Sequence, residues 1–251
     1  MSQMKALLSF LFRWRPTRQT SVAFGTGIVA VALSAAMIPL DRWPLAVILV
    51  RDIGQMFLVG FLFPLIYIPH SDADFASFGL TMRRWYLFLP INIGLAALLY
   101  LKLMSSSPPP PGFQLDALAL WNAGYVMVAL SFELLFFYAF LRTLFEWAFG
   151  PVVAVVLAAL FYSLHHVGFQ PEFAKLFLVG LLYATVFRLG NSALSIYPFF
   201  LAVGGIHDVL FKSQVVATVQ YPALRMLVLS ALMLATVVWA WRSKHAARVP
   251  R

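Results

Sequence analysis

Long apolar runs dominate the sequence, and short segments rich in charged residues, proline and glycine separate them. An α-helix needs roughly 17–25 residues to cross a bilayer, and eight of the runs are about this long. They cover residues 20–39, 45–68, 85–103, 117–142, 150–167, 173–189, 193–211 and 221–241. The pattern predicts an all-α fold, a polytopic membrane bundle of about eight transmembrane helices.

The composition agrees with a membrane protein and excludes several other classes. Hydrophobic residues make up 62% of the 251 residues and charged residues only 11%, against about 25% in ordinary soluble domains. Open sheets cannot pair their edges in lipid, and the alternating pattern of a membrane β-barrel is absent. The chain has no cysteine, which excludes a disulfide framework, a thiol nucleophile and a thiolate metal site.

The chain divides into three parts. Residues 1–19 mix Leu and Phe with basic residues and carry no small-residue cleavage site, so we expect an interfacial amphipathic segment and not a removable signal peptide. Residues 20–241 form the transmembrane bundle, and residues 242–251 form a basic cytoplasmic tail.

The net charge of +9 reflects orientation in the membrane, and we expect no nucleic-acid partner, because the basic residues lie mostly between apolar runs. With the N-terminus in the cytoplasm, twelve Lys and Arg residues fall in inner segments and five in outer segments. The inner set is Lys5, Arg13, Arg15, Arg18, Arg83, Arg84, Arg142, Arg188, Arg242, Lys244, Arg248 and Arg251, and the outer set is Arg42, Lys102, Lys175, Lys212 and Arg225. This asymmetry predicts that both termini are cytoplasmic.

Two connecting segments carry distinct chemistry. The outer loop at residues 105–113 contains four consecutive prolines, which favour a stiff spacer, with binding to a proline-recognising partner as the alternative. The inner loop carries His70, Asp72 and Asp74, which could bind a cation. We favour a solvated turn for this loop.

Three ionisable residues interrupt apolar runs and are the candidates for chemistry. Glu133 lies in the run 117–142, while His165 and His207 lie near the ends of two later runs. Counted from the midpoint of each run at about 1.5 Å per residue, Glu133 lies roughly 5 Å to the inner side, and His165 and His207 roughly 10 and 7 Å to the outer side. Because each such residue costs insertion energy, we expect the three to share one polar site, with helix tilt absorbing the offset in depth.

A buried carboxylate beside an imidazole can activate water by accepting and returning a proton, and a second imidazole can stabilise an oxyanion. This chemistry suits peptide hydrolysis without a covalent intermediate and needs no cofactor. A divalent metal such as zinc at Glu133, His165 and His207 is the alternative, although no H-E-x-x-H motif is present. A proton relay in a transporter, or a structural role for each residue, also stays open.

Three further ionisable residues have simpler interpretations. Neighbouring residues on a helix point about 100° apart, so we expect His166 to be an outer-interface residue and not a member of the site. Arg51 and Asp52 lie near the outer part of the second run and could form a buried pair. We expect them instead to snorkel to the interface.

The candidate residues occur in short motifs that resemble the CAAX protease and bacteriocin-processing family, the glutamic-type intramembrane proteases also called Abi proteins. Glu133 opens a sequence similar to the first motif of the family, E-E-x-x-x-R followed by small-x-L. Phe161 and His165 match the second motif, F-x-x-x-H, and His207 closes a run that resembles the last family segment. The resemblance covers roughly residues 77–211, the protease-like core.

Three positions depart from the family pattern. Leu134 replaces the second Glu and Tyr138 replaces the Arg, which removes an expected ion pair. Phe211 stands where the family often has Asn or Asp, and Asp208 is too close in sequence to His207 to take that role on the same helical face.

The resemblance implies that Glu133 and His165 activate water and that His207 stabilises the oxyanion. It implies a peptidase whose substrate is a membrane-associated protein or peptide, cut near a C-terminal processing or sorting signal. We expect a prokaryotic plasma (inner) membrane location. A proton-coupled transporter and a non-catalytic immunity or scaffold relative are the alternatives.

Overall fold

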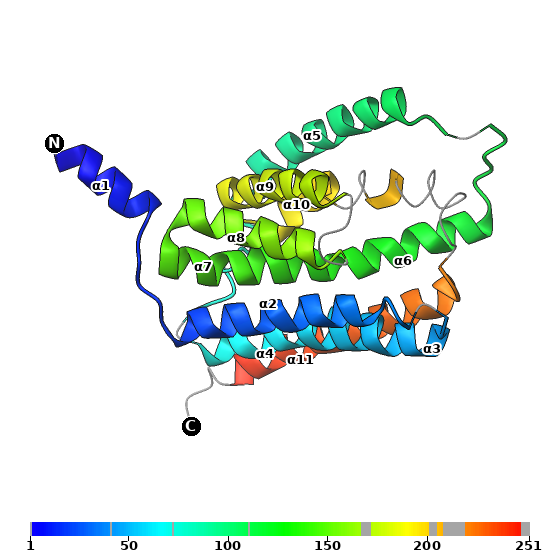
Figure 1. Ribbon diagram of the computed structural model, residues 1–251, viewed down its shortest axis with the longest axis horizontal. Helices are drawn as coiled ribbons and strands as arrows, with labels where there is room; N and C mark the ends of the chain where they lie inside the picture. Colours follow the sequence, from blue (N-terminus) through cyan, green and yellow to red (C-terminus); the bar gives the residue numbers. More distant parts are fainter. Residues whose placement is uncertain are drawn as a thin grey trace.

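The computed structural model describes residues 2–40, 42–71, 73–109, 111–166, 172–200, 205–207 and 219–246, and every regular element in these residues is helical (Figure 1). In chain order the elements are α1 (Ser2–Leu11), α2 (Arg18–Ala36), α3 (Pro44–Val47), η1 (Ile48–Leu62), α4 (Phe63–Tyr67), η2 (Ile68–His70), α5 (Trp85–Ser106), α6 (Ala117–Glu133), η3 (Leu134–Leu141), α7 (Arg142–Phe149), α8 (Pro151–Leu164), α9 (Phe173–Gly190), α10 (Ala193–Phe199) and α11 (Pro222–Ala246). The elements η1 and η3 are π-helical, and η2 is a 3₁₀-helix. The predicted all-α class is confirmed.

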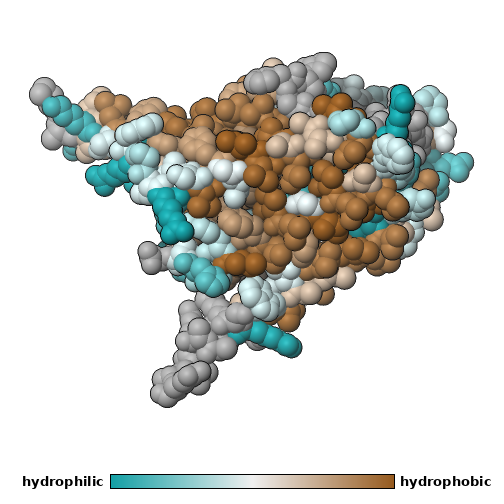
Figure 2. Space-filling model, turned by 60° about the horizontal axis from the view of Figure 1, so that its bottom comes forward, coloured by the Kyte–Doolittle hydropathy of each residue, from teal (hydrophilic) through white to brown (hydrophobic). Residues whose placement is uncertain are grey.

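Within the described residues, six helical stretches are long and apolar enough to cross a membrane: Arg18–Ala36, Pro44–His70, Trp85–Ser106, Ala117–Phe149, Phe173–Gly190 and Pro222–Ala240. The face of the molecule drawn in Figure 2 is hydrophobic over a broad middle region, with hydrophilic residues toward its two ends. The chain is therefore a multi-pass membrane protein.

Two of the eight predicted runs differ from these six stretches. The run 150–167 corresponds to the 14-residue α8, which is shorter than a full crossing. The run 193–211 contains the seven-residue α10 and residues outside the described part. Eight crossing helices remain a prediction.

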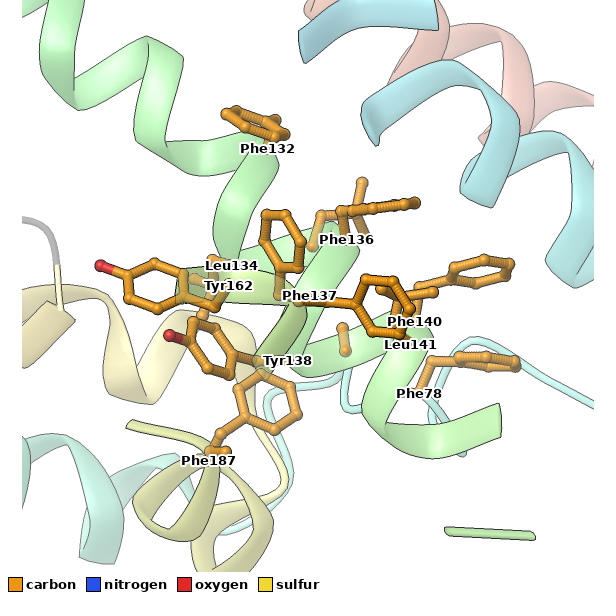
Figure 3. Close-up of a cluster of buried hydrophobic side chains, with 14 of the residues drawn as sticks. Phe78, Phe132, Leu134, Phe136, Phe137, Tyr138, Phe140, Leu141, Tyr162 and Phe187 are labelled. Atoms are coloured by element: carbon orange, nitrogen blue, oxygen red, sulfur yellow. The ribbon is translucent and has the colours of Figure 1, made fainter. Parts of the chain in front are cut away.

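The elements α6, η3 and α7 form one continuous helix of 33 residues, Ala117–Phe149, at the centre of the bundle (Figure 1). In the most apolar 18-residue stretch of this helix 67% of the residues are buried, whereas in the corresponding stretch of α5 only 11% are buried. All eight residues of η3, Leu134–Leu141, are buried, because a helix that is apolar on every side must be surrounded by other helices. Their side chains pack with Phe78, Phe132, Tyr162 and Phe187 in an aromatic core (Figure 3).

The remaining helices pack on two sides of this central helix (Figure 1). On one side, α2 packs against η1 and α7, and α11 packs against α6 and η1. On the other side, α8 packs between α7 and α9, and α10 joins α9 to α5. The central helix is therefore enclosed, while α5 lies at the periphery.

A sharp turn between α7 and α8 sets the level of the predicted site. Gly150 has φ 82°, a conformation that favours glycine, and Pro151 then begins α8 with its ring at the first helical turn. The chain then reverses its direction, and α8 runs back along α7 and η3. The helix α8 has 14 residues, while α7 and η3 have eight residues each. The end of α8 therefore reaches the level of Glu133, which directly precedes η3.

An ionic cluster links α7 to α9. Glu146 accepts from Arg142 through Oε2 at 2.5 Å and from Arg188 through Oε1 at 2.9 Å. Arg142 is buried, with 3% of its surface exposed, so the shared carboxylate offsets the cost of enclosing its charge. The cluster fixes the two helices that flank α8.

The helix α1 projects from one end of the bundle, where α11 also ends (Figure 1). Its Leu7, Leu8 and Phe10 are exposed. In the loop after η2, Asp74 accepts from the backbone and hydroxyl of Ser77 at 2.8 and 2.6 Å, as in a capped turn, while Asp72 lies outside the described residues.

Candidate functional site

Glu133 and His165 are in contact. The Nε2 atom of His165 lies 3.1 Å from Oε1 of Glu133, and both side chains are buried. Glu133 is the middle residue of the helix Ala117–Phe149, because that helix continues beyond the predicted end at residue 142. The contact shows that the predicted offset in depth between the two residues was wrong, and the longer central helix accounts for the roughly 5 Å assigned to Glu133.

Packing fixes the position of His165. The Ser34 hydroxyl of α2 donates to the His165 carbonyl oxygen, which ties the end of α8 to α2. The imidazole lies against the rings of Phe137 and Phe132, with centroids 4.5 and 5.8 Å away. The ring is thus held between apolar surfaces with one edge toward Glu133.

The hydrogen bonds of the imidazole determine its tautomer. Nδ1 of His165 lies 2.5 Å from the Tyr162 carbonyl oxygen, and a carbonyl only accepts, so Nδ1 carries a proton. In a neutral ring Nε2 is then an acceptor. The 3.1 Å contact with Glu133 therefore contains one shared proton, held either by the carboxyl group or by the ring.

His166 also belongs to the site, which corrects the prediction that it lies at the outer interface. Its Nε2 lies 3.8 Å from Glu133 Oε1, and its Nδ1 donates to the Tyr162 carbonyl oxygen at 2.9 Å. The helix α8 ends at Leu164, so His165 and His166 lie in a turn where the 100° separation of helical neighbours does not hold. Sequence periodicity could not locate that end.

These three side chains are the group that could hold a metal among the described residues. One ligand atom each from Glu133, His165 and His166 lies within 4.8 Å of the others. Both imidazoles donate through Nδ1 to a backbone carbonyl and present Nε2, the arrangement usual for metal-binding histidines. The group differs from the predicted alternative set, which had His207 in place of His166.

The site lines a cavity of about 670 Å³. Glu133, His165 and His166 share its wall with His207, Tyr183 and Gln55. Oε2 of Glu133 makes no hydrogen bond with the described residues, so it can still accept one from a bound molecule. The cavity is large enough for a peptide segment and for water.

His207 lies on the wall of the same cavity and outside the group of three. Its side chain is buried, and Nε2 donates to the Ser107 carbonyl oxygen at 3.1 Å. To donate to an oxyanion through Nε2, His207 must exchange this carbonyl for the substrate. The structure thus brings His207 to the site, with its Nε2 donor bonded to the loop that follows α5.

The positions that depart from the family motif are buried beside the site. Leu134 and Tyr138 both belong to η3, and the ring of Tyr138 packs 5.5 Å from that of Tyr162 (Figure 3). The Tyr138 hydroxyl makes no hydrogen bond with the described residues. Apolar and aromatic packing therefore replaces the expected ion pair, while Phe211 and Asp208 lie outside the described residues.

A second buried polar network contradicts the prediction that Asp52 snorkels to the interface. Asp52 is 1% exposed and accepts from Arg225 Nε and Nη2 at 2.6 and 2.7 Å. Tyr125 donates to the same carboxylate at 2.8 Å. Arg225 lies within α11 and not in an outer loop, so the charge of Asp52 is paired inside the bundle.

Comparison of the chain with models of protein families, with curated proteins and with solved structures finds no match. The function therefore has to be argued from the residues and their geometry.

Proposed function

We propose that the protein is an intramembrane endopeptidase of the glutamic type, which hydrolyses a peptide bond with a water that Glu133 and His165 activate. The observation that carries the proposal is their 3.1 Å contact on the wall of a cavity of about 670 Å³. A positioned base within reach of a bound water typically accelerates such a reaction by about 10²–10⁴.

The reaction follows from the proton that the two residues share. When the pair has lost that proton, Glu133 Oε1 and His165 Nε2 both become acceptors, and a water can donate to them. The water oxygen attacks the carbonyl carbon of the substrate while its proton passes to the pair. The tetrahedral intermediate then collapses, the C–N bond breaks, and the pair returns the proton to the leaving amine.

His207 is proposed to stabilise the oxyanion of this intermediate. Its position on the cavity wall supports the role, and its Nε2–H is a donor. Substrate binding would replace the Ser107 carbonyl by the developing oxyanion. A negatively charged oxygen is the stronger acceptor, so the exchange favours the transition state.

We further propose that the chain is a relative of the CAAX protease and bacteriocin-processing family. The contact of the Glu in the first motif with the His in the second supports this assignment. So does the place of His207 in the same cavity. The substituted positions Leu134 and Tyr138 are filled by packing, which leaves the two reacting side chains in contact.

The substrate is proposed to be a membrane-associated protein or peptide, cut near a C-terminal processing or sorting signal. The location is proposed to be a prokaryotic plasma (inner) membrane, with eight crossing helices and both termini cytoplasmic. The projection of α1 from the end of the bundle where α11 ends supports termini on one side (Figure 1). Ser34, Ser107 and Lys175 line the cavity and lie at or near the ends of α2, α5 and α9. In the proposed orientation these helix ends face the outer side of the membrane, so the cavity would lie toward that side.

A metal-dependent hydrolase is the second candidate, and the cluster of Glu133, His165 and His166 favours it. Carboxylate oxygen and imidazole nitrogen are ligands of catalytic zinc. A bound divalent ion would activate water by its own charge. Both candidates cut the same bond and differ in whether His166 and a metal are needed.

The experiment compares the new peptide termini in membranes of cells that produce the wild-type protein or Glu133→Gln. Mass spectrometry should detect termini that depend on Glu133. Production of the same termini by both proteins would contradict the proposal. Proton-driven uptake that Glu133→Gln abolishes, with no new termini, would favour the transporter alternative.

A further inference from the structure

Among the described residues, the charged side chains on the cavity wall are paired, except for Arg51. Glu133 contacts His165, and outside the catalytic group Glu172 lies 3.6 Å from Lys175. Glu172 and Lys175 both line the cavity and are exposed. Arg51 also lines the cavity and is half-buried, and within the described residues its guanidinium makes no hydrogen bond or ion pair.

The neighbouring acid does not neutralise Arg51. Both carboxylate oxygens of Asp52 accept from Arg225, and Oδ1 also accepts from Tyr125. Asp52 points into this buried network, whereas Arg51 faces the cavity. Asp52 and Arg51 therefore face different surroundings, although they are adjacent in sequence.

Arg51 lines the same cavity as Glu133 and His165. Among the described residues, the ion-pair partners of Glu133 are His165 and His166 and not Arg51. Arg51 and the reacting residues thus share one cavity without direct contact. A molecule that reaches Glu133 can place a second group against Arg51.

The remaining wall defines the character of that molecule. Leu99, Leu103, Val126 and Leu130 line the same cavity as Arg51. No carboxylate of the described residues contacts Arg51, and an arginine that lacks such a partner within a membrane protein is costly and marks a binding site. The planar guanidinium of arginine can donate two parallel hydrogen bonds to the two oxygens of a carboxylate.

We propose that Arg51 is a specificity-determining residue that binds a carboxylate of the substrate, within an otherwise apolar peptide segment. The inference rests on the proposed peptidase function for the identity of the ligand. A peptide supplies carboxylates as Asp and Glu side chains or as its C-terminus. The phosphate of an anionic lipid is the rival source of the same negative charge.

The test measures binding and cleavage separately. Fluorescent apolar peptides are prepared in matched pairs that carry Glu or Gln at one position, or a free or amidated C-terminus. Binding is measured with the full-length Glu133→Gln protein in a neutral detergent, and cleavage with the wild-type protein. Each is repeated with Arg51→Gln, with Arg51→Lys, and with Lys102→Gln as the control for loss of an exposed charge on α5.

The carboxylate member of at least one pair should bind roughly tenfold or more tightly, because the bond to arginine is charge-assisted. Arg51→Gln should abolish this preference, Arg51→Lys should retain part of it, and Lys102→Gln should leave it unchanged. Charge-selective binding that depends on Arg51 without cleavage by the wild-type protein would support the inference and contradict the proposed peptidase.

Three results would overturn the inference. The first is equal binding of both members of every pair by protein with Arg51 intact. The second is an equal loss of cleavage of both members in Arg51→Gln, which would place Arg51 in support of Glu133. The third is a preference for phosphatidylglycerol over phosphatidylcholine vesicles that Arg51→Gln removes while peptide binding is unchanged, which would assign Arg51 to lipid phosphate.

Discussion

Oε1 of Glu133 and Nε2 of His165 are 3.1 Å apart, although the residues are 32 positions apart. Glu133 is the middle residue of the helix Ala117–Phe149, and His165 directly follows α8. The Tyr162 carbonyl oxygen holds the proton of the imidazole on Nδ1. Nε2 therefore faces the carboxyl group as an acceptor, and one proton lies between the two side chains. In the proposed reaction the pair first loses this proton and then accepts a proton from the attacking water.

His165 and His166 should contribute unequally to cleavage. His165→Gln removes the acceptor that contacts Glu133, and we expect a loss of at least about 100-fold in kcat/KM. His166→Gln removes a ring whose Nε2 lies 3.8 Å from Glu133, and we expect a smaller loss. Steady-state kinetics on one cleaved peptide measures both, and an equal, complete loss would contradict water activation by the Glu133–His165 pair alone.

Metal removal distinguishes the two proposed forms of hydrolysis. If Glu133 and His165 act without a metal, dialysis against EDTA or phenanthroline should leave the cleavage rate unchanged. Elemental analysis of the purified protein is the parallel measurement. One zinc per chain, lost together with activity and restored by added zinc, would instead support a centre formed by Glu133, His165 and His166.

The buried pair of Asp52 and Arg225 should matter for stability. Asp52→Asn leaves the buried Arg225 without its counter-charge, and breaking such a pair typically costs about 3–5 kcal/mol. The free energy of unfolding in a mixed-detergent titration measures this cost. Lys102→Gln, which removes an exposed charge, is the control and should stay within about 0.5 kcal/mol of wild type.

The double variant Asp52→Leu/Arg225→Met tests the origin of that cost. Removing both charges avoids the uncompensated ion, so the double variant should be more stable than the sum of the single effects. Strict additivity would contradict direct coupling between the two side chains.

Gly60 should be needed for the close approach of η1 to the central helix. A Cβ atom at this position would collide with the ring of Phe132, the residue before Glu133. Gly60→Ala should destabilise the protein by about 1–3 kcal/mol and lower the cleavage rate, because the ring beside the site must shift.

Gly94 offers the matched control for Gly60. It also lies within a helix, and no atom lies within 4 Å of an added Cβ. Gly94→Ala should therefore be neutral or slightly stabilising, by up to about 1 kcal/mol. Equal stability of the two variants in thermal unfolding would contradict the packing argument.

The hydrophobic pattern was sufficient to predict the helical membrane fold and to single out Glu133 and His165. A lone acid in an apolar run is conspicuous because burial must be compensated. The extent of the central helix was harder to predict, since Arg142 marks a loop by its charge but is paired with Glu146 inside the helix. Helix ends depend on such tertiary contacts.

The charged partners could not be predicted from local sequence. Asp52 and Arg225 are 173 positions apart, and neither residue carries a signal for the other. His166 was missed because periodicity assumes a continuing helix, whereas α8 ends at Leu164. Arg51 and Asp52 are adjacent and face different surroundings, which only the packing of η1 reveals.

The measurement that tests the account most directly is the rate of peptide cleavage by purified Glu133→Gln relative to wild type, with equal folding shown by circular dichroism. Gln keeps the size of the side chain and removes its capacity to carry the proton. We predict a loss of at least about 100-fold in kcat with little change in KM. Cleavage by Glu133→Gln at the wild-type rate would contradict the account.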